Sequence, residues 1–478
     1  MAMKFWIFVW KFIVVTLVAA IFVGCSKYDL PNREQEGENS AEEERLLKAN
    51  QFVYDYTRLA YLWEEYIPAN VSYRSADNPQ ELFELMRYSR LDSWSYVTDN
   101  SQETLDEFKG VSTTFGYSLS FGRFSNDPEH YFAVVRFVYP NSPAQAAGLK
   151  RGDFIVTVGG EKITTDNYRK LYYGSSIVAG LGRQNPGGVI SLSGVEVSMT
   201  AVKMYEDPVV EYSVIDAGGV KVGYLFYAGF YAESHEKLVE VFEWFKENGV
   251  SELILDLRYN LGGNAKTPPY LSSMIAPQSV IEEKSVFYTE KWNRLFMEFY
   301  KDRGDDMNVY FHPDIPVNLN LNRVYILVTE STASASEATI TGLMPYMDVV
   351  KIGSSSYGKC CGAALFSPKD DDGNVDKEIG NWLLSLVIYK FVNADGYTDF
   401  NDGIPADYEV ADTGLLTGIP LGDVSDPMIA KALEIITGSV QTKSAGMQVP
   451  QGVEILPHLG ENPLKGGMMK FTAVPAIE

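Results

Sequence analysis

A serine-rich turn and one lysine downstream of it carry the residue types best suited to covalent catalysis in this chain. Ser334 lies in the run Ser-Thr-Ala-Ser-Ala-Ser-Glu (331–337), and Lys359 ends the run Ser-Ser-Ser-Tyr-Gly-Lys (354–359). A serine hydroxyl needs a base within hydrogen-bond reach, and a lysine serves as that base only when it is neutral. Because burial lowers the pKa of an amine, a lysine behind apolar strands can accept a proton near neutral pH. Such Ser-Lys pairs work without a histidine.

The segments around these residues predict the elements that would position them. Residues 324–328, Val-Tyr-Ile-Leu-Val, are typical of a buried strand, and residues 337–347 predict a short helix. A turn between a strand end and a helix start gathers backbone amides, and the helix dipole favours negative charge there. A developing oxyanion would be stabilised at such a turn. A second apolar run, 349–352, leads on to the segment that carries Lys359.

A purely structural interpretation of the same turn exists. Ser334 and Glu337 fit the capping-box pattern, in which the serine caps a helix and the glutamate reaches back to the serine amide. Helix caps far outnumber catalytic serines, so the motif taken alone favours this interpretation.

The two motifs together resemble a known signature. Thr-Ala-Ser-Ala-Ser-Glu (332–337) followed by Tyr-Gly-Lys (357–359) resembles the active-site signature of the C-terminal processing peptidases, also called tail-specific serine proteases. The spacing between the motifs is also the usual one in that family. The resemblance implies a serine endopeptidase in which Ser334 is the nucleophile and Lys359 is the general base, and it extends from about residue 90 to 437.

One departure from the family pattern supports an alternative function. Family members often have Gly directly after the lysine and Gln four positions beyond it, where this chain has Cys360 and Ala363. The Gln helps to hold the lysine, so a hydroxyl of residues 354–356 is the candidate for orienting the base here. The alternative is a peptide-binding lipoprotein on the same scaffold with little or no catalysis.

A glycine pair marks the other half of the expected site. Residues 220–230 predict a strand, 234–248 a helix and 253–258 a second strand, and this β-α-β order implies helices layered on a largely parallel sheet. The strand ends in Asn-Leu-Gly-Gly (260–263), which resembles a family motif that holds an oxyanion-hole amide at Gly262 or Gly263, the other amide being that of Ala335. A tight turn without a ligand is the alternative for the glycines.

Residues 113–205 resemble a PDZ domain. The resemblance rests on Asn-Ser-Pro-Ala-Gln-Ala-Ala-Gly-Leu-Lys-Arg-Gly-Asp (141–153), followed by the strand 154–158. PDZ domains bind a peptide as an added strand on a sheet edge. Residues 116–121 are where that edge is expected, with the peptide-binding positions Tyr117, Leu119 and Phe121. An ordinary hairpin with no ligand is the alternative, because alternation does not show an open edge.

The N-terminus resembles a bacterial lipoprotein signal. Basic residues flank an aromatic start, residues 12–23 are apolar except for Thr16, and Val-Gly-Cys (23–25) closes the segment. Cleavage before Cys25 would make this residue the acylated N-terminus and place the protein on a membrane of the cell envelope, exported and lipid-anchored. A plain signal anchor is the alternative. Residues 25–45 are charged and predict a flexible tether.

Composition limits the remaining partners. The formal net charge of −23 excludes nucleic acid and anionic lipid surfaces as expected partners. With Cys25 lipidated, Cys360 and Cys361 are too few for a disulfide framework, and two adjacent cysteines without a nearby histidine are a poor metal site. We therefore expect no cofactor and no metal, and interpret both thiols as packing residues.

The predicted organisation is an α/β multidomain chain. Its parts are a signal peptide (1–24), a tether (25–45), an N-terminal helical region (46–112), a PDZ domain (113–205), a layered β-α-β peptidase core (206–440) and a C-terminal extension (441–478). The expected partner is a polypeptide, either a C-terminal tail or an unfolded segment. The pattern leaves the oligomeric state open.

Overall fold

The computed structural model describes residues 33–185, 188–439, 449–456 and 468–471. Cys25 and the predicted signal peptide lie outside these residues. The chain separates into two compact units, residues 1–44 and 45–478, and the second contains all the sites discussed below. Within the described ranges, no helix combines the length and the apolar composition that a membrane span requires.

The N-terminal region is helical, as predicted. Its elements are α1 (Arg33–Ala60), the 3-10 helix η1 (Glu64–Tyr66), α2 (Pro79–Met86), β1 (Tyr96–Thr98) and α3 (Ser101–Phe108). Helix α1 begins inside the segment 25–45 that the sequence assigned to a flexible tether, so that segment is helical from Arg33 onward. Glutamate, a strong helix former, supplies six of the thirteen residues from 33 to 45.

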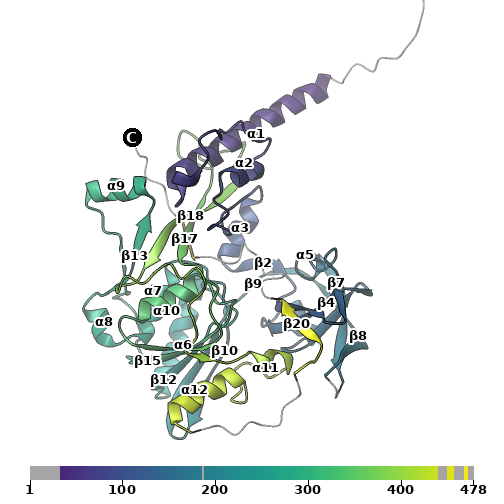
Figure 1. Ribbon diagram of the computed structural model, residues 1–478, viewed down its shortest axis with the longest axis vertical. Coiled ribbons are helices and arrows are strands. Elements are labelled where there is room, and N and C mark those ends of the chain that lie inside the picture. Colours follow the sequence, from purple (N-terminus) through teal and green to yellow (C-terminus); the bar gives the residue numbers. More distant parts are fainter. Residues whose placement is uncertain (1–32, 186–187, 440–448, 457–467, 472–478) are drawn as a thin grey trace, which may run out of the picture. The chain divides into compact units, whose positions relative to one another are not determined.

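The predicted PDZ domain is built on an antiparallel sheet with the strand order β20-β3-β4-β5-β7-β8 (Figure 1). Its last strand in sequence, β20, comes from the C-terminal extension, and the short pair β2-β9 forms a separate ribbon. The elements are β2 (Val111–Thr114), β3 (Tyr117–Phe124), β4 (Asp127–Val138), α4 (Pro143–Ala146), β5 (Phe154–Val158), β6 (Glu161–Lys162), α5 (Lys170–Tyr173), β7 (Ser176–Gln184), β8 (Ile190–Thr200), β9 (Val202–Tyr205) and β20 (Val453–Leu456).

The core contains the expected parallel sheet, with the strand order β10-β11-β12-β15-β16-β19 and parallel pairing from β11 through β19. The predicted β-α-β order is confirmed as β11, α6 and β12. The elements on and around this sheet are β10 (Val209–Ala217), β11 (Val220–Tyr227), η2 (Ala232–Ser234), α6 (His235–Glu247), β12 (Glu252–Asp256), α7 (Thr267–Ile275), α8 (Gln278–Glu282), β15 (Arg323–Val328), α10 (Ala335–Leu343), β16 (Asp348–Gly353), β19 (Tyr408–Glu409), α11 (Thr413–Leu416) and α12 (Pro427–Thr437).

Helices cover both faces of this sheet, as buried parallel sheets require. Leu255 and Ile326 belong to the apolar cluster that includes α6, α7 and α10. Their neighbours Ile254 and Leu327 belong instead to the cluster that includes α12, because successive side chains of a strand point to opposite faces. The nucleophile candidate therefore lies at the edge of a three-layer core, where β15 passes into α10.

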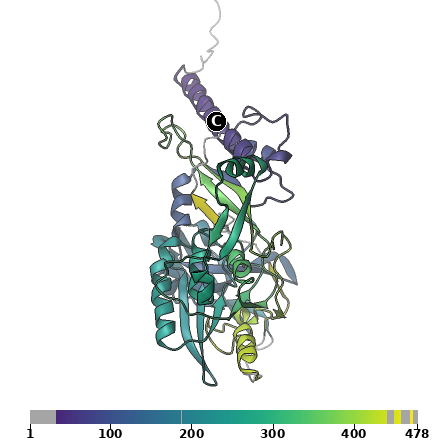
Figure 2. The same cartoon turned by 90° about the vertical axis from the view of Figure 1, so that its left-hand side faces the viewer.

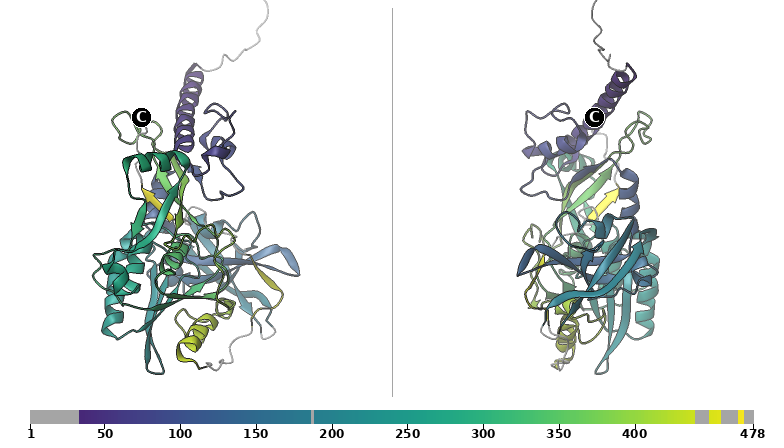
Figure 3. Two further views of the ribbon diagram at one scale, coloured as in Figure 1. Left: turned by 60° about the vertical axis from the view of Figure 1, so that its left-hand side comes forward. Right: turned by 90° about the vertical axis from the view of Figure 1, so that its right-hand side faces the viewer.

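A second sheet includes one strand from the N-terminal region and one from the C-terminal extension. Its order is β14-β13-β18-β17-β21, and β1 from the N-terminal region pairs with β18. In Figures 2 and 3, β21 is the yellow arrow beside the green strands β17 and β18. The elements are β13 (Val286–Trp292), α9 (Arg294–Arg303), β14 (Asn308–Tyr310), β17 (Cys361–Phe366), β18 (Leu383–Val392) and β21 (Met468–Phe471).

Candidate active site

Ser334 is the last residue before α10 and is held in an unusual backbone conformation. Its φ is 58° and its ψ is −104°, and its side chain is completely buried. A positive φ at a residue other than glycine costs about 1–3 kcal/mol and persists only where the surrounding structure enforces it. In the α/β-hydrolase fold, a strained turn between a strand and a helix presents a nucleophilic serine. The conformation marks Ser334 as more than an ordinary cap.

The carboxylate of Glu337 joins the serine turn (residues 331–334) to the lysine loop (residues 354–359). One oxygen, Oε2, accepts the backbone N–H of Ser334 at 2.6 Å and that of Lys359 at 2.9 Å. The other, Oε1, accepts the Ser356 hydroxyl at 2.6 Å and the Gly358 amide at 2.7 Å. Because both amides donate to the same oxygen atom, the backbone nitrogens of Ser334 and Lys359 must lie close together.

The predicted capping box is present, since Glu337 reaches back to the Ser334 amide. The same carboxylate also organises the segment that carries Lys359, which the capping interpretation alone does not explain. Glu337 is fully buried, and this burial raises the pKa of its carboxyl group, while its four hydrogen-bond donors oppose the rise. The cap thus serves as the structural link between the two catalytic candidates.

Lys359 precedes β17 and is 2 % exposed. Burial lowers the pKa of its amine below the ordinary 10.5, and the charges of Asp92 and Glu337 oppose that effect. A second link fixes the lysine loop, because the Tyr357 amide donates to the Thr332 carbonyl at 2.9 Å. The amine is thus desolvated and is carried by a loop that is bonded to the serine turn.

Trp94 covers the lysine amine. The Lys359 Nζ lies 5.3 Å from the centroid of the Trp94 ring. Trp94 lies two residues before β1, which pairs with β18, and β18 pairs in turn with β17, the strand that follows Lys359. The buried indole N–H of Trp94 has no acceptor within the described part of the chain. Sequence reasoning assigned no chemistry to this segment, because only the pairing of β1 brings it to the site.

The departure at Ala363 fits this arrangement. Ala363 is buried in β17, opposite Val387. Its methyl group cannot hydrogen-bond the lysine as a glutamine would. Of the three hydroxyls suggested by sequence for orienting the base, that of Ser356 donates to Glu337. It therefore acts on the lysine loop through the carboxylate.

The glycine loop (residues 260–263) lies against the serine turn. Gly262 has a φ of +106°, and a Cβ added there would come within 3.0 Å of both the Ser334 Cβ and the Ala335 amide nitrogen. Asn260 fixes the loop, because its side chain accepts the Gly262 amide at 2.9 Å and its carbonyl accepts the Ala333 amide at 3.0 Å. Only glycine permits this approach.

The three candidate oxyanion donors differ in how they are engaged. The Gly262 N–H already bonds to the Asn260 side chain. Within the described residues, the N–H groups of Gly263 and Ala335 have no protein acceptor. These two amides, one on the glycine loop and one on the first residue of α10, are the ones able to receive new negative charge.

A buried arginine fixes the start of the glycine loop. Arg258 is fully buried and bonds Asp256, Asp412 and Asp426, at 2.8 to 3.0 Å. These three carboxylates come from the end of β12 and from the two segments that precede α11 and α12. These ion pairs hold the start of the glycine loop against segments that are distant in the sequence.

Two further arginines connect the predicted PDZ domain to the core. Arg136 of β4 donates to the Ser331 hydroxyl at 3.1 Å, three residues before Ser334. Arg151, from the motif that suggested a PDZ domain, donates to Asp412 at 3.0 Å and to the Tyr259 hydroxyl at 2.8 Å. The sequence motif identified Arg151 but not its role in joining the domains.

The three residues predicted to bind peptide have buried side chains. Tyr117, Leu119 and Phe121 are exposed by 4 %, 1 % and 0 %, and all three belong to the core of the predicted PDZ domain. The prediction that these three positions bind peptide stays a prediction, and of the three Tyr117 also lines the cavity described next. The alternation on β3 reflects one buried face, and what the strand can offer a peptide is its backbone edge.

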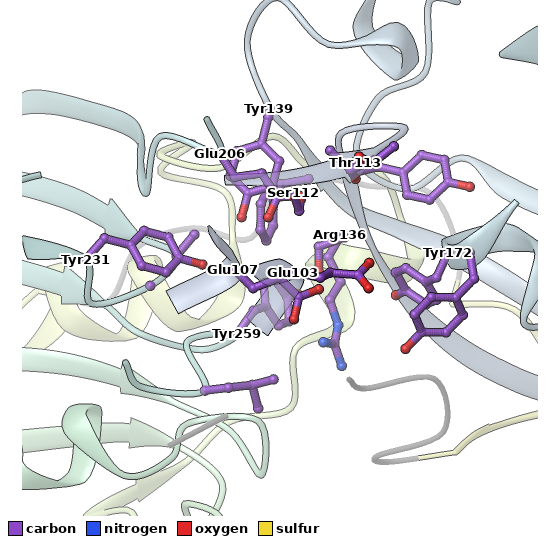
Figure 4. Close-up of a pocket in the computed structure, with 18 of the residues that line it drawn as sticks. Glu103, Glu107, Ser112, Thr113, Arg136, Tyr139, Tyr172, Glu206, Tyr231 and Tyr259 are labelled. Carbon is purple, nitrogen blue, oxygen red and sulfur yellow. The ribbon is translucent and has the colours of Figure 1, made fainter. Parts of the chain in front are cut away.

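A cavity of about 370 Å³ connects this edge with the glycine loop (Figure 4). Tyr117 and Ser118 from the start of β3, and Tyr172 from α5, line one part of it. Leu261 and Gly262 line the part near the serine turn. The cavity thus gives a route between the predicted peptide-binding edge and the candidate catalytic residues.

The two adjacent cysteines after Lys359 are in surroundings that disfavour the reactive thiolate form. Cys360 and Cys361 are free and buried, and burial raises the pKa of both thiols, that of Cys360 to about 11. A protonated thiol is a poor nucleophile and a poor metal ligand. Among the described residues, no three His, Cys, Asp or Glu side chains gather as a metal site.

Comparison with known proteins agrees with this architecture. Residues 48–96 match the peptidase S41 N-terminal domain, residues 134–176 match a PDZ domain, and residues 221–410 match peptidase family S41. The chain is 26% identical over 254 residues to the carboxyl-terminal-processing protease of Picosynechococcus sp., covering 52% of this chain and 55% of that protein. It is 23% identical over 328 residues to the enzyme of that name from Synechocystis sp., covering 68% and 69%.

A solved structure extends the likeness to the fold. A protein of Bacteroides fragilis assigned to the S41 proteases superposes with a TM-score of 0.66 at 26% identity, covering 81% of this chain and 97% of the other. The alignment spans only about half of the first curated relative, so activity and substrate are treated below as proposals. The chain therefore contains, in this order, an S41 N-terminal domain, a PDZ domain and a peptidase S41 domain.

Proposed function

We propose that this protein is a serine endopeptidase with a Ser334–Lys359 dyad, which cleaves C-terminal or unfolded polypeptide segments captured by its PDZ domain. The observation that carries the proposal is the shared acceptor. One buried carboxylate oxygen, Oε2 of Glu337, receives the backbone amides of both Ser334 and Lys359. The desolvated amine and the strained serine at the helix start supply the base and the nucleophile that the chemistry needs.

In the proposed reaction each of these groups has one role. The neutral Lys359 amine takes the Ser334 hydroxyl proton as Oγ bonds to the scissile carbonyl carbon. The carbonyl oxygen becomes an oxyanion near the Ala335 and Gly263 amides. The peptide C–N bond breaks as the lysine ammonium returns its proton to the leaving amine. Water then attacks the Ser334 ester by the same proton transfers, which releases the acid and restores the serine.

Trp94 has two roles in this proposal. Its ring excludes water from the Lys359 amine, which keeps the amine neutral before reaction, and attracts the ammonium once it forms. Trp94 is thus a group that contacts the lysine amine in a chain that lacks the usual glutamine.

An unstructured peptide with a free carboxyl terminus tests the proposal. We expect cleavage by the parent protein and none by Ser334→Ala or Lys359→Ala, with Glu330→Ala, an exposed position in the same turn, as the control that keeps activity. Undiminished cleavage by both dyad variants overturns the site assignment. Tight peptide binding by the parent without turnover establishes the peptide-binding alternative.

The cellular setting is proposed separately. The N-terminal pattern supports export and acylation of Cys25, which would hold the enzyme on a membrane of a bacterial cell envelope. Metabolic labelling with a radioactive fatty acid should mark the parent chain, and Cys25→Ser should lose the label and enter the soluble fraction. A Cys25→Ser chain that keeps the label contradicts lipidation at this residue.

A further inference from the structure

The outer edge of β3 is the strand edge that the PDZ domain would offer to a peptide. One side of β3 pairs with β4 along its length, so only the other side can accept an additional strand. An extended peptide bound there would use the backbone N–H and C=O groups that point away from β4. In this structure, two elements of the chain itself already use those groups.

The first element is β20 from the C-terminal extension. It lies antiparallel to β3, with Val453 opposite Phe124 and Leu456 opposite Phe121. In Figure 1 it is the yellow arrow among the blue strands of the PDZ domain. Val453 and Ile455 pack against the apolar cluster around Phe132, Val134 and Phe154, as alternate residues of a paired strand should.

The close fit of β20 depends on a glycine in β3. A Cβ on Gly122 would come within 2.8 Å of the Glu454 carbonyl oxygen and within 2.3 Å of the Phe132 ring. A glycine inside a strand often marks a place where another backbone approaches closely. The edge at Gly122 therefore suits a bound strand.

The second element is the hydroxyl of Tyr172 on α5. It accepts the Leu119 amide at 3.1 Å and donates to the Leu119 carbonyl at 3.2 Å. These are the two backbone groups of one residue that a pairing strand would bond, so the hydroxyl replaces one rung of a ladder. The Tyr172 ring stays in place by packing on Tyr117 and Phe121, with centroids 6.4 and 6.2 Å away.

We propose that β20 and the Tyr172 hydroxyl occupy the peptide-binding edge of the PDZ domain, and that an incoming polypeptide must displace them. The inference rests on the proposed function and adds its regulation. The displacing ligand would be an extended segment with apolar residues at alternate positions, the pattern of β20 itself. The apparent affinity for the peptide is then the intrinsic affinity multiplied by the fraction of molecules whose edge is open. Any change that opens the edge therefore tightens binding.

The contacts that hold β20 are suited to reversible release. The strand is short, and Val453, Ile455 and Leu456 are only partly buried. Its ion pair with the described part of the chain, Glu454 with Arg123 at 2.7 Å, is exposed to solvent, where such pairs contribute little. Elements with few buried contacts open at low free-energy cost while the rest of the fold persists.

Two variants test the proposal in full-length Ser334→Ala protein, which prevents turnover. Tyr172→Phe removes the hydroxyl and keeps the ring, and its control is Tyr173→Phe at the neighbouring position, which is 63% exposed. Ile455→Asp places a charge in the apolar cluster and should release β20, and its control is Val449→Asp, 41% exposed in the same tail. The probe is a fluorescent peptide with the sequence of residues 450–456, and the measurement is its Kd by anisotropy.

We expect Tyr172→Phe to tighten binding at least about threefold, because the hydroxyl makes two hydrogen bonds and the usual net effect of one is about three- to tenfold. Ile455→Asp should tighten binding at least about tenfold. Both controls should bind like the parent. Hydrogen exchange gives a second readout, because the amides of Phe121 and Arg123, which alternate with those that face β4, should be protected in the parent and should exchange faster in Ile455→Asp.

The outcomes separate this proposal from the proposed function. Equal binding by parent, variants and controls shows that the peptide site is elsewhere and overturns the occupied edge. No binding by any protein, with faster exchange in Ile455→Asp, shows that the opened edge does not accept peptide and also overturns it. The catalytic proposal is tested independently, by cleavage of an unstructured peptide with Ser334 intact.

Discussion

Replacing Glu337 with glutamine changes one atom at the junction of the two catalytic segments. The carboxylate accepts four hydrogen bonds, two on each oxygen. A glutamine keeps one acceptor oxygen and substitutes a donor for the other. If the amide nitrogen takes the Oε2 position, the Ser334 and Lys359 amides both lose their acceptor. In the opposite orientation the Gly358 amide loses it, and the Ser356 hydroxyl must rotate to accept.

The expected cost follows from those counts. A buried donor left without an acceptor costs about 1–3 kcal/mol, and hydrogen bonds to charged groups lie at the upper end. With one or two such donors, Glu337→Gln should lower the free energy of unfolding by about 2–5 kcal/mol. Because the lost bonds fix the spacing of the two segments, a displacement of about 1 Å should also lower kcat about 100-fold.

Urea unfolding and kcat/KM on an unstructured peptide measure both effects. The matched control is Glu330→Gln, the same chemical change at an exposed position four residues before Ser334. We expect this control to stay within about 0.5 kcal/mol of the parent, as exposed substitutions usually do. The reasoning is refuted if the two glutamine variants have the same stability and the same kcat.

Three further substitutions address the other parts of the site. Burial lowers the pKa of Lys359 relative to the unfolded chain, so the unfolded state binds more protons and the parent should gain stability as pH rises toward 10.5. Lys359→Met should remove that slope and raise the melting temperature at neutral pH, which calorimetry across pH would measure; an unchanged slope contradicts the buried amine. Arg258→Met should destabilise the fold by about 3–5 kcal/mol, since it leaves buried carboxylates without their partner, and a loss below about 1 kcal/mol in urea unfolding contradicts the network. Gly262→Ala should abolish cleavage through its contact with Ser334 and strain at φ +106°, and an active variant contradicts the position of the loop.

Local sequence patterns predicted the parts of the fold that depend on local periodicity. The strands β5, β11, β12 and β15 and the helix α6 appear where apolar runs and 3.6-residue repeats predicted them. Glu337 was also visible as part of a capping box. Its second function, the contact with the lysine loop, was not visible, because it depends on where β17 lies relative to α10.

The features that sequence reasoning missed all depend on distant pairing. Trp94 reaches Lys359 through the pairing of β1 with β18, and Arg151 reaches Asp412 across two domains. The strand β20 lies in an extension that carried no clear pattern, yet it completes the PDZ sheet. Such contacts are set by tertiary packing, and no periodicity within one segment encodes them. For the related reason that alternation identifies a buried face without showing which edge is covered, the peptide-binding role of Tyr117, Leu119 and Phe121 stays a prediction.

The most direct test of the catalytic proposal is the pH dependence of acylation at Ser334. A peptide ester can be mixed with enzyme in single turnover, quenched in acid and analysed by mass spectrometry to locate and quantify the acyl group. We predict an acyl group on Ser334 whose formation rate rises with pH and levels off below 10.5, and no such acylation in Lys359→Ala. Acylation of another residue, or the same pH dependence in Lys359→Ala, would contradict a neutral lysine acting as the base.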